Sequence, residues 1–160
     1  MSEVTIRPAV AEDRPFLVDM LVEIANSPYY LSTRAELLAD PRVLHYVDGW
    51  PRPSDVGVLA VRGDRPIGAA WVRFFTEEDP SDGFVGEDVP ELAVGVDEAE
   101  RGHGVGKLLL HAIHDVARAA GIARISLSVD RPNRAAALYV AHGYREVRGS
   151  EHSQVMVLDL

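Results

Sequence analysis

The sequence predicts an α/β protein with a mixed, mainly antiparallel sheet of about seven strands and helices on both faces. Segment 56–75 contains two apolar runs separated by a turn signal, as a β-hairpin does, and segments 144–147 and 154–160 should form two last antiparallel strands around 148–153. Segment 92–129 has the pattern of a strand, a glycine-rich loop, a helix and a second strand. The 160 residues can bury a real core, so we expect a single domain over 1–160.

The first part of the chain predicts one strand followed by helices. Residues 4–8 alternate as a strand does, and a helix with a proline in its first turn should follow and end near Asn26. Thr33 and Glu36 have the spacing of a capping box at the start of a short helix. Asp40 stands before a proline and would cap a further short turn.

The remaining elements follow from breaks in the apolar pattern. Prolines and glycines interrupt segments 50–54 and 76–89, which we expect to be loops. The expected strands are 56–61, 66–75, 92–96, 122–129, 144–147 and 154–160, and a short helix is expected over 134–142. No internal repeat or linker is visible, which agrees with a single domain.

The organising feature is the loop after the strand at 92–96. Gly102, Gly104 and Gly106 stand at alternate positions, and an amphipathic helix follows that Gly121 should close. The first turn of a helix has free backbone N–H groups, and its dipole favours negative charge. Glycines let a phosphate approach the backbone. The pattern therefore predicts a site for a phosphorylated cofactor.

Two common phosphate-binding motifs do not match this loop. A P-loop has four residues between its first glycine and Gly-Lys, followed by Ser or Thr, whereas here three residues separate Gly102 from Gly106 and Leu108 follows the lysine. A dinucleotide fingerprint would need a glycine at Lys107. The pattern Arg101-x-x-Gly104-x-Gly106 remains, and a glycine-rich turn that only tightens the connection is the alternative reading.

The remaining pattern resembles the acyl-CoA loop of the GCN5-related N-acetyltransferases (GNAT), whose signature is Arg/Gln-x-x-Gly-x-Gly/Ala. Asn133, Leu138-Tyr139 and Gly143-Tyr144 resemble a second pattern of the same family, one helix and one strand further on. The resemblance implies a V-shaped acyl-CoA cleft in the sheet and transfer of acetyl from acetyl-CoA to a primary amine by direct attack on the thioester. Members of this family often dimerise, so a homodimer stays open, and we expect a cytoplasmic enzyme.

The resemblance also assigns cofactor contacts. The strand backbone would pair with the pantetheine arm, Gly95 would mark a bulge where this strand parts from the next, and the loop would hold the pyrophosphate. The expected cofactor-binding residues are Val94, Gly95, Val96, Arg101, Gly102, His103, Gly104, Val105, Gly106, Lys107 and Asn133.

Two residues are candidates for catalysis. Acyl transfer needs a group that removes the amine proton and a group that stabilises the departing thiolate. Glu91, just ahead of the glycine-bearing strand, is the best-placed carboxylate for the first task, with ordered water or a solvated strand-end charge as alternatives. Tyr139 would direct its hydroxyl at the thioester sulfur, and a packing role in the core is the alternative.

Aromatic and histidine residues give weaker signals. Tyr29, Tyr30 and Trp50 lie where the family binds its acceptor and could line that pocket. His111 and His114 are three residues apart without the glutamate of a zinc helix, so we expect a solvated face and no metal.

Composition excludes several other functions. The net charge of −9 argues against nucleic-acid binding and is compatible with a cationic acceptor such as an amine. No apolar run is long enough for a membrane span, and no signal peptide is visible. The absence of cysteine excludes disulfides and thiolate chemistry and is compatible with the cytoplasm. Two alternatives stay open: a non-catalytic acyl-CoA-binding or regulatory domain, and a transferase for a longer acyl-CoA.

Overall fold

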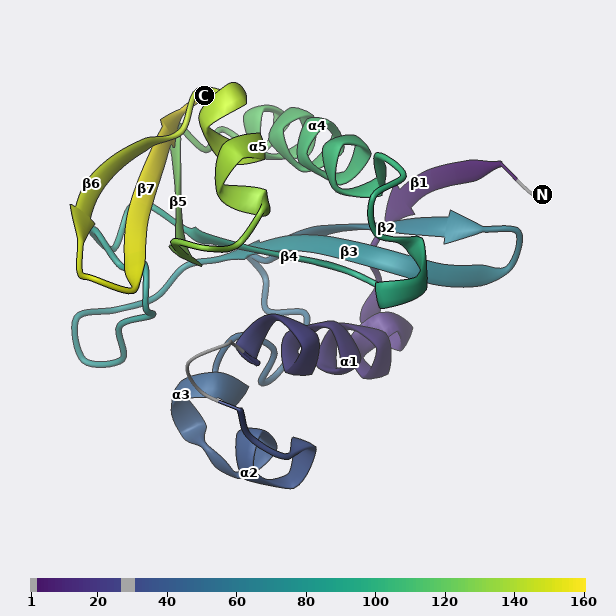
Figure 1. Ribbon diagram of the computed structural model, residues 1–160, viewed down its shortest axis with the longest axis horizontal. Coiled ribbons are helices and arrows are strands. Elements are labelled where there is room, and N and C mark those ends of the chain that lie inside the picture. Colours follow the sequence, from purple (N-terminus) through teal and green to yellow (C-terminus); the bar gives the residue numbers. More distant parts are fainter. Residues whose placement is uncertain (1–2, 27–30) are drawn as a thin grey trace.

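The computed structural model describes residues 3–26 and 31–160, and within them a seven-stranded sheet lies between two layers of helices (Figure 1). The strands are β1 (Val4–Pro8), β2 (Val56–Arg62), β3 (Arg65–Arg73), β4 (Glu91–Val96), β5 (Arg124–Asp130), β6 (Arg145–Gly149) and β7 (Ser153–Asp159). The helices are α1 (Arg14–Ala25), α2 (Arg34–Ala39), α3 (Pro41–Leu44), α4 (Val105–Ala119) and α5 (Ala135–Ala141), with short 3-10 turns η1 (Ala11–Asp13) and η2 (Glu98–Glu100).

The sheet has the order β1-β2-β3-β4-β5-β7-β6. Every neighbouring pair is antiparallel except β4 and β5, which run parallel. The mixed, mainly antiparallel sheet expected from the sequence is therefore confirmed, as are both hairpins.

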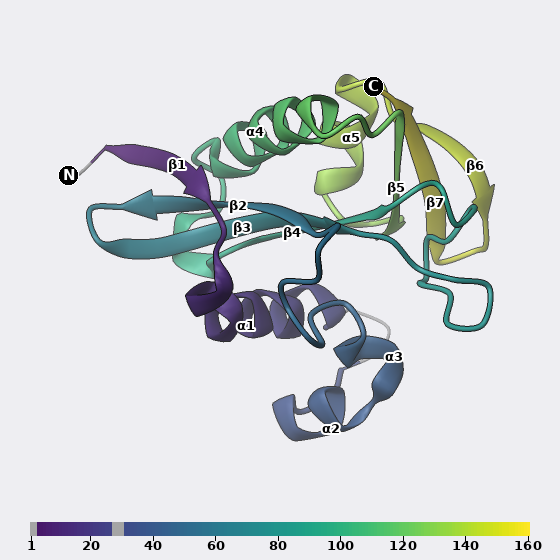
Figure 2. The same ribbon diagram turned by 180° about the vertical axis from the view of Figure 1, so that it is seen from behind.

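Helices cover both faces, as predicted: α4 and α5 lie on one face, and α1, α2 and α3 lie on the other (Figures 1 and 2). Successive side chains of a strand point to opposite faces. Along β2, Val58 and Ala60 accordingly join the core under α4, whereas Leu59 and Val61 join the core over α1. The central strands are buried on both sides, and this is why they are almost continuously apolar.

The local signals of the sequence have the expected structural causes. Thr33 and Glu36 exchange the two hydrogen bonds of a capping box, each 3.1 Å long. The helix α4 ends at Ala119, and Gly121, just after its cap, has a φ of +81° that favours glycine. The next N–H, from Ile122, donates to the Ala117 carbonyl at 3.1 Å and so closes the last turn.

A buried arginine fixes the chain between α3 and β2. The side chain of Arg73 on β3 is only 1% exposed and pairs with Asp55 at 2.7 Å. Its guanidinium also donates to the carbonyl oxygens of His45, at 2.9 Å, and Asp48, at 2.7 Å. A buried charge is tolerated when it is paired and hydrogen bonded in this way. The segment that carries Tyr46 is thus held against the sheet.

Two expectations are wrong. The pairing of β3 with β4 runs without a shift through Gly95, so this glycine marks no bulge. A Cβ at Gly95 would lie 3.1 Å from the Cβ of Met20, so the glycine instead lets α1 approach the sheet closely. His114 is not on a solvated face: it is 5% exposed and its Nε2 lies 2.8 Å from the Tyr144 hydroxyl. Burial lowers the pKa of His114 to about 4, so the ring is neutral.

Candidate active site

The two parallel strands of the sheet part almost as soon as they meet. Glu91 of β4 pairs with Ser126 of β5, and the two strands have no further paired residues. A cleft with a volume of about 1440 Å³ opens beyond this point. Its lining includes Glu91, at the start of β4, the glycine loop, which follows the end of β4, and Tyr139 of α5. The topology therefore creates the cleft without any bulge.

The glycine loop presents backbone groups to one end of this cleft. Gly102 and Gly104 have φ angles of +79° and +83°, and a Cβ on either would meet no heavy atom within 4 Å. No side chain caps the first turn of α4, and no acidic residue lies in it. Lys107 lines the cleft from the same turn. Open space, free N–H groups and a lysine together suit a phosphorylated ligand.

The neighbouring basic side chains differ in their availability. Arg101 lines the cleft, and its guanidinium donates to the Val96 carbonyl at 3.1 Å and to Glu23 at 2.9 Å. His103 is the one residue of 101–107 that is not among the cleft-lining residues, and its Nδ1 lies 3.3 Å from the Glu100 carbonyl. The cleft thus receives Lys107 directly, whereas Arg101 also holds the loop against β4 and α1.

The walls of the cleft come from β4, β5 and the start of α5. Val94, Gly95 and Val96 line it along β4, on the side where no strand pairs with them. Asn133 lines it at the start of α5, where its Oδ1 accepts a hydrogen bond of 2.9 Å from the Ala135 N–H. The free edge of β4 is therefore available for an extended ligand, as strand edges generally are.

Tyr139 lies on α5 and lines the cleft. The residue is 8% exposed and packs against the Tyr144 ring at a centroid distance of 5.6 Å. Its hydroxyl has no hydrogen-bond partner within the described part of the chain. Burial raises the pKa of Tyr139 to about 12, so its hydroxyl stays protonated at neutral pH. An unbonded phenol that keeps its proton can serve as a donor to a ligand in the cleft.

Glu91 lies at the other end, where several donors surround its carboxylate. The Tyr46 hydroxyl donates a short hydrogen bond to Oε2, and the Ser81 hydroxyl donates to Oε1 at 3.1 Å. The backbone of Gly83 supplies another hydrogen bond. Burial is the main cause that raises the pKa of Glu91 to about 7, against the lowering effect of these donors. A carboxyl that titrates near neutral pH is suited to proton transfer.

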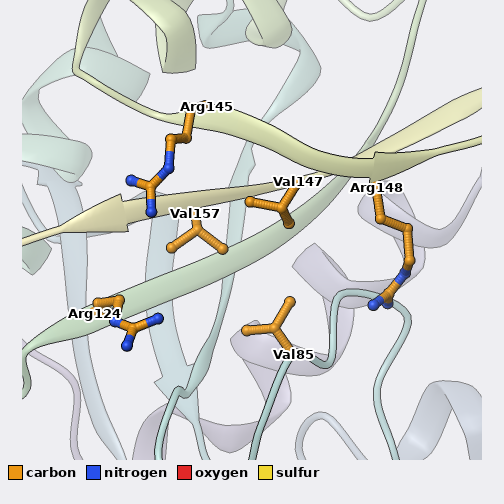
Figure 3. A pocket seen from close by; sticks show the side chains of 6 residues that line it. All are labelled: Val85, Arg124, Arg145, Val147, Arg148 and Val157. Atoms are coloured by element: carbon orange, nitrogen blue, oxygen red, sulfur yellow. The ribbon is translucent and has the colours of Figure 1, made fainter.

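The loop 76–89 covers Glu91, and β6 holds that loop. The Arg148 guanidinium donates to the Phe84 carbonyl at 3.0 Å and approaches the Asp82 carbonyl at 3.5 Å. Figure 3 shows the Arg148 side chain extending from β6 towards the part of the loop that carries Val85. Arg148 also lines a hollow of about 340 Å³ between the loop and the sheet. Three valines and three arginines line it: Val85, Val147, Val157, Arg124, Arg145 and Arg148. Two of its arginines are partly neutralised, because Arg124 and Arg145 both pair with Asp159.

The acceptor residues expected from the sequence fare differently. Trp50 does not line the cleft: it is 6% exposed, and its indole N–H donates to the Val10 carbonyl in the core over α1. Tyr29 and Tyr30 lie outside the described residues. The sequence did not predict that Tyr46 and Ser81 belong to the site. Both are hydrogen bonded to Glu91, from which they are 45 and 10 residues apart in the sequence. No local pattern in the sequence marks such contacts.

The described residues contain no candidate metal site and no candidate membrane-spanning helix. Within 3–26 and 31–160, no group of three or more His, Asp or Glu side chains could hold a metal ion. No helix among these residues is both long and apolar enough to cross a membrane.

The parted strands, the cleft between them and the glycine loop at a helix N-terminus together form a site that suits an extended, phosphorylated ligand. The sequence matches the acetyltransferase (GNAT) family over residues 18–144. The chain therefore belongs to the GNAT acetyltransferase family, and the class expected from the sequence is confirmed.

Individual relatives agree with this assignment. A mycothiol acetyltransferase from Thermobispora bispora is 36% identical over 87 residues, which are 54% of this chain and 28% of that protein. The chain thus matches little more than a quarter of that relative's length. What the relative acts on is therefore no guide by itself to the acceptor of this chain.

Solved structures share the fold. The GNAT domain of S. lividans PAT has a TM-score of 0.69 and 24% identity, covering 98% of this chain and 90% of that one. The PaiA N-acetyltransferase of Thermoplasma acidophilum, solved in complex with coenzyme A, has a TM-score of 0.65 and 16% identity, covering 99% of both chains. The ribosomal-protein-S18-alanine N-acetyltransferase of Escherichia coli has a TM-score of 0.67 and 18% identity, covering 98% and 94%.

Proposed function

We propose that the protein transfers an acetyl group from acetyl-CoA to a primary amine by direct attack on the thioester. One observation carries the proposal: a single cleft joins a glycine loop that suits a phosphorylated ligand, a protonated phenol and a carboxyl that titrates near neutral pH. Membership of the GNAT family supports the same reaction. A non-catalytic binding domain would have no need for the last two groups.

The cofactor end of the cleft supplies binding. Backbone N–H groups at the start of α4, with Lys107 beside them, bind the pyrophosphate, and the open space at Gly102 and Gly104 leaves room for it. The free edge of β4 at 94–96 holds the extended arm that joins the pyrophosphate to the thioester. Asn133 lies beside this arm, and its side chain accepts a hydrogen bond from the Ala135 N–H at the start of α5.

The residues of the other end of the cleft carry out proton transfer. Acetyl-CoA, when bound, supplies the acetyl group and a thiol as the leaving group. As the new C–N bond forms and the C–S bond breaks, Glu91 accepts the proton that the amine must lose. Tyr139 donates a hydrogen bond or its proton to the departing sulfur, because its hydroxyl is neutral and no described residue binds it.

Direct turnover tests the proposal. The chain has no cysteine, so CoA released by the purified protein can be followed with a thiol reagent without a protein background. The amine panel should contain polyamines, amino acids, small amino sugars and peptides that begin with alanine. The alanine peptides follow from the ribosomal-protein-S18-alanine N-acetyltransferase among the similar structures.

A second panel of acyl-CoA donors tests the acyl group. We expect acetyl-CoA to raise the melting temperature and to support amine-dependent CoA release, and longer acyl-CoA thioesters to react more slowly. Equal stabilisation by NAD or ATP would overturn the cofactor assignment. CoA binding without turnover on any amine, in a protein that stays folded, would favour the non-catalytic alternative.

A further inference from the structure

The carboxylate of Glu91 has nearly all of its hydrogen-bonding capacity occupied by protein. Ser81 donates to Oε1, and Oε1 also faces the Gly83 backbone, which supplies a hydrogen bond. The Tyr46 hydroxyl donates to Oε2. Each carboxylate oxygen is therefore held by a hydroxyl donor, and Tyr46 holds Oε2.

Tyr46 is itself fixed in the orientation of a donor. The backbone N–H of Asp82 donates to its hydroxyl oxygen at 3.1 Å, so the hydroxyl proton is directed to Glu91. The indole N–H of Trp71 donates to the Tyr46 carbonyl at 2.9 Å. The Tyr46 ring packs against the Phe75 ring at a centroid distance of 5.2 Å. Together with Arg73, which binds the neighbouring carbonyls, these contacts give the phenol one position.

From this geometry we infer that Tyr46 is a positioning residue of the transfer site: its hydroxyl orients the Glu91 carboxylate and stabilises the ionised form that accepts the amine proton. The inference rests on the proposed role of Glu91 as the base. It adds a residue from the segment after α3 to a site otherwise built by β4, β5 and α5.

The other groups around Glu91 leave this task to Tyr46. Asp82 from the loop 76–89 disfavours the ionised form by charge repulsion. Arg73, opposite Glu91 on β3, is engaged by Asp55. Ser126, opposite Glu91 on β5, is uncharged. Among the donors that favour the ionised form, Tyr46 has a larger effect than Ser81 or the Gly83 backbone.

The test compares pH profiles of single-site variants. Removing the phenolic hydroxyl in Tyr46→Phe deletes one hydrogen bond to a charged group and keeps the ring. The acid limb of the kcat/KM profile should move up by about one pH unit, from about 7 towards 8. The ratio of wild-type to variant kcat/KM should be roughly tenfold at pH 6.5 and close to one at pH 9.5. Titration of the acceptor amine cancels in this ratio.

Two further variants serve as controls. Ser81→Ala removes the weaker donor and should shift the same limb by a smaller amount. Tyr144→Phe makes the same chemical change at another buried tyrosine, which shares a hydrogen bond with His114 and does not touch Glu91. It should leave the limb where it is, even if the protein loses stability. A structural role for Tyr46 would give the behaviour of Tyr144→Phe.

A direct titration separates this inference from the proposed function. The Glu91 carboxyl carbon can be followed by NMR in protein labelled at glutamate, with Glu91→Gln identifying the resonance. We expect its pKa to rise in Tyr46→Phe and to stay unchanged in Tyr144→Phe. An unchanged pKa in Tyr46→Phe overturns the inference about Tyr46. If instead the pKa rises while Glu91→Gln keeps a normal rate and acid limb, Tyr46 controls the carboxyl but Glu91 is not the base, which overturns the proposed role of Glu91.

Discussion

Replacing Tyr139 by phenylalanine separates a catalytic hydroxyl from a structural one. The substitution keeps the ring that packs against Tyr144 and removes only the oxygen. Because the hydroxyl has no hydrogen-bond partner within the described part of the chain, no protein hydrogen bond is lost. We therefore expect the free energy of unfolding to change by less than about 0.5 kcal/mol. CoA affinity should also be close to that of the wild type.

Turnover should respond very differently. Loss of one acid–base group lowers the rate by about 10²- to 10⁴-fold. If the hydroxyl acts mainly on the departing sulfur, this loss should appear in the single-turnover rate and leave ground-state binding unaffected. The measurements are the melting temperature, the Kd for CoA and the single-turnover rate, all on one preparation.

Tyr144→Phe provides the matched control. Its hydroxyl shares a 2.8 Å hydrogen bond with His114, so the same substitution should cost about 1 kcal/mol, or about 2–4 °C in melting temperature. The rate per folded molecule should be normal. The two tyrosines, whose ring centroids are 5.6 Å apart, thus predict opposite patterns. A stable Tyr139→Phe protein that binds CoA and turns over at the wild-type rate refutes the catalytic reading.

Two further predictions concern the ends of the cleft. Gly104→Val should abolish the stabilisation by CoA, because the φ of +83° disfavours a β-branched residue and its side chain would enter the open space of the loop. Gly86→Val, outside the cleft lining, is the control. A rise in melting temperature with CoA that persists in Gly104→Val would contradict the loop assignment. Glu91→Gln should flatten the pH dependence of stability. Burial raises the pKa of Glu91 from 4.5 to about 7, so its stabilisation is complete below pH 4.5 and is lost as the pH rises through 7, by about 3 kcal/mol. Identical melting-temperature profiles for wild type and Glu91→Gln between pH 4 and 8 would show that the carboxyl is not perturbed in this way.

Several features of the fold could be predicted because their causes lie within a few residues of chain. The capping box of Thr33 and Glu36 joins groups one helical turn apart. The end of α4 just before Gly121 depends on one φ angle and the hydrogen bonds of the last turn. The hairpin over 56–75 likewise shows in the sequence as two apolar runs separated by turn residues. Such signals can be recognised in the sequence because they do not depend on contacts with distant parts of the chain.

The site was predicted unevenly for the same reason. The glycine loop is a local motif, and the structure places it at the N-terminus of α4 beside the cleft. The position of Trp50 in the core and the burial of His114 were not predicted. Each depends on which distant segment packs against the residue: Val10 for Trp50 and Tyr144 for His114.

The sequence by itself determined the kinds of chemical group, their order and the strand–loop–helix unit that suits a phosphorylated ligand. Only the tertiary structure decided where β4 and β5 part, because that depends on a pairing between strands 35 residues apart, limited to Glu91 and Ser126. Only it could bring Tyr46, Ser81 and Gly83 onto one carboxylate. The pKa of Glu91 depends on burial and on these donors, and neither exists until segments far apart in the sequence have packed together.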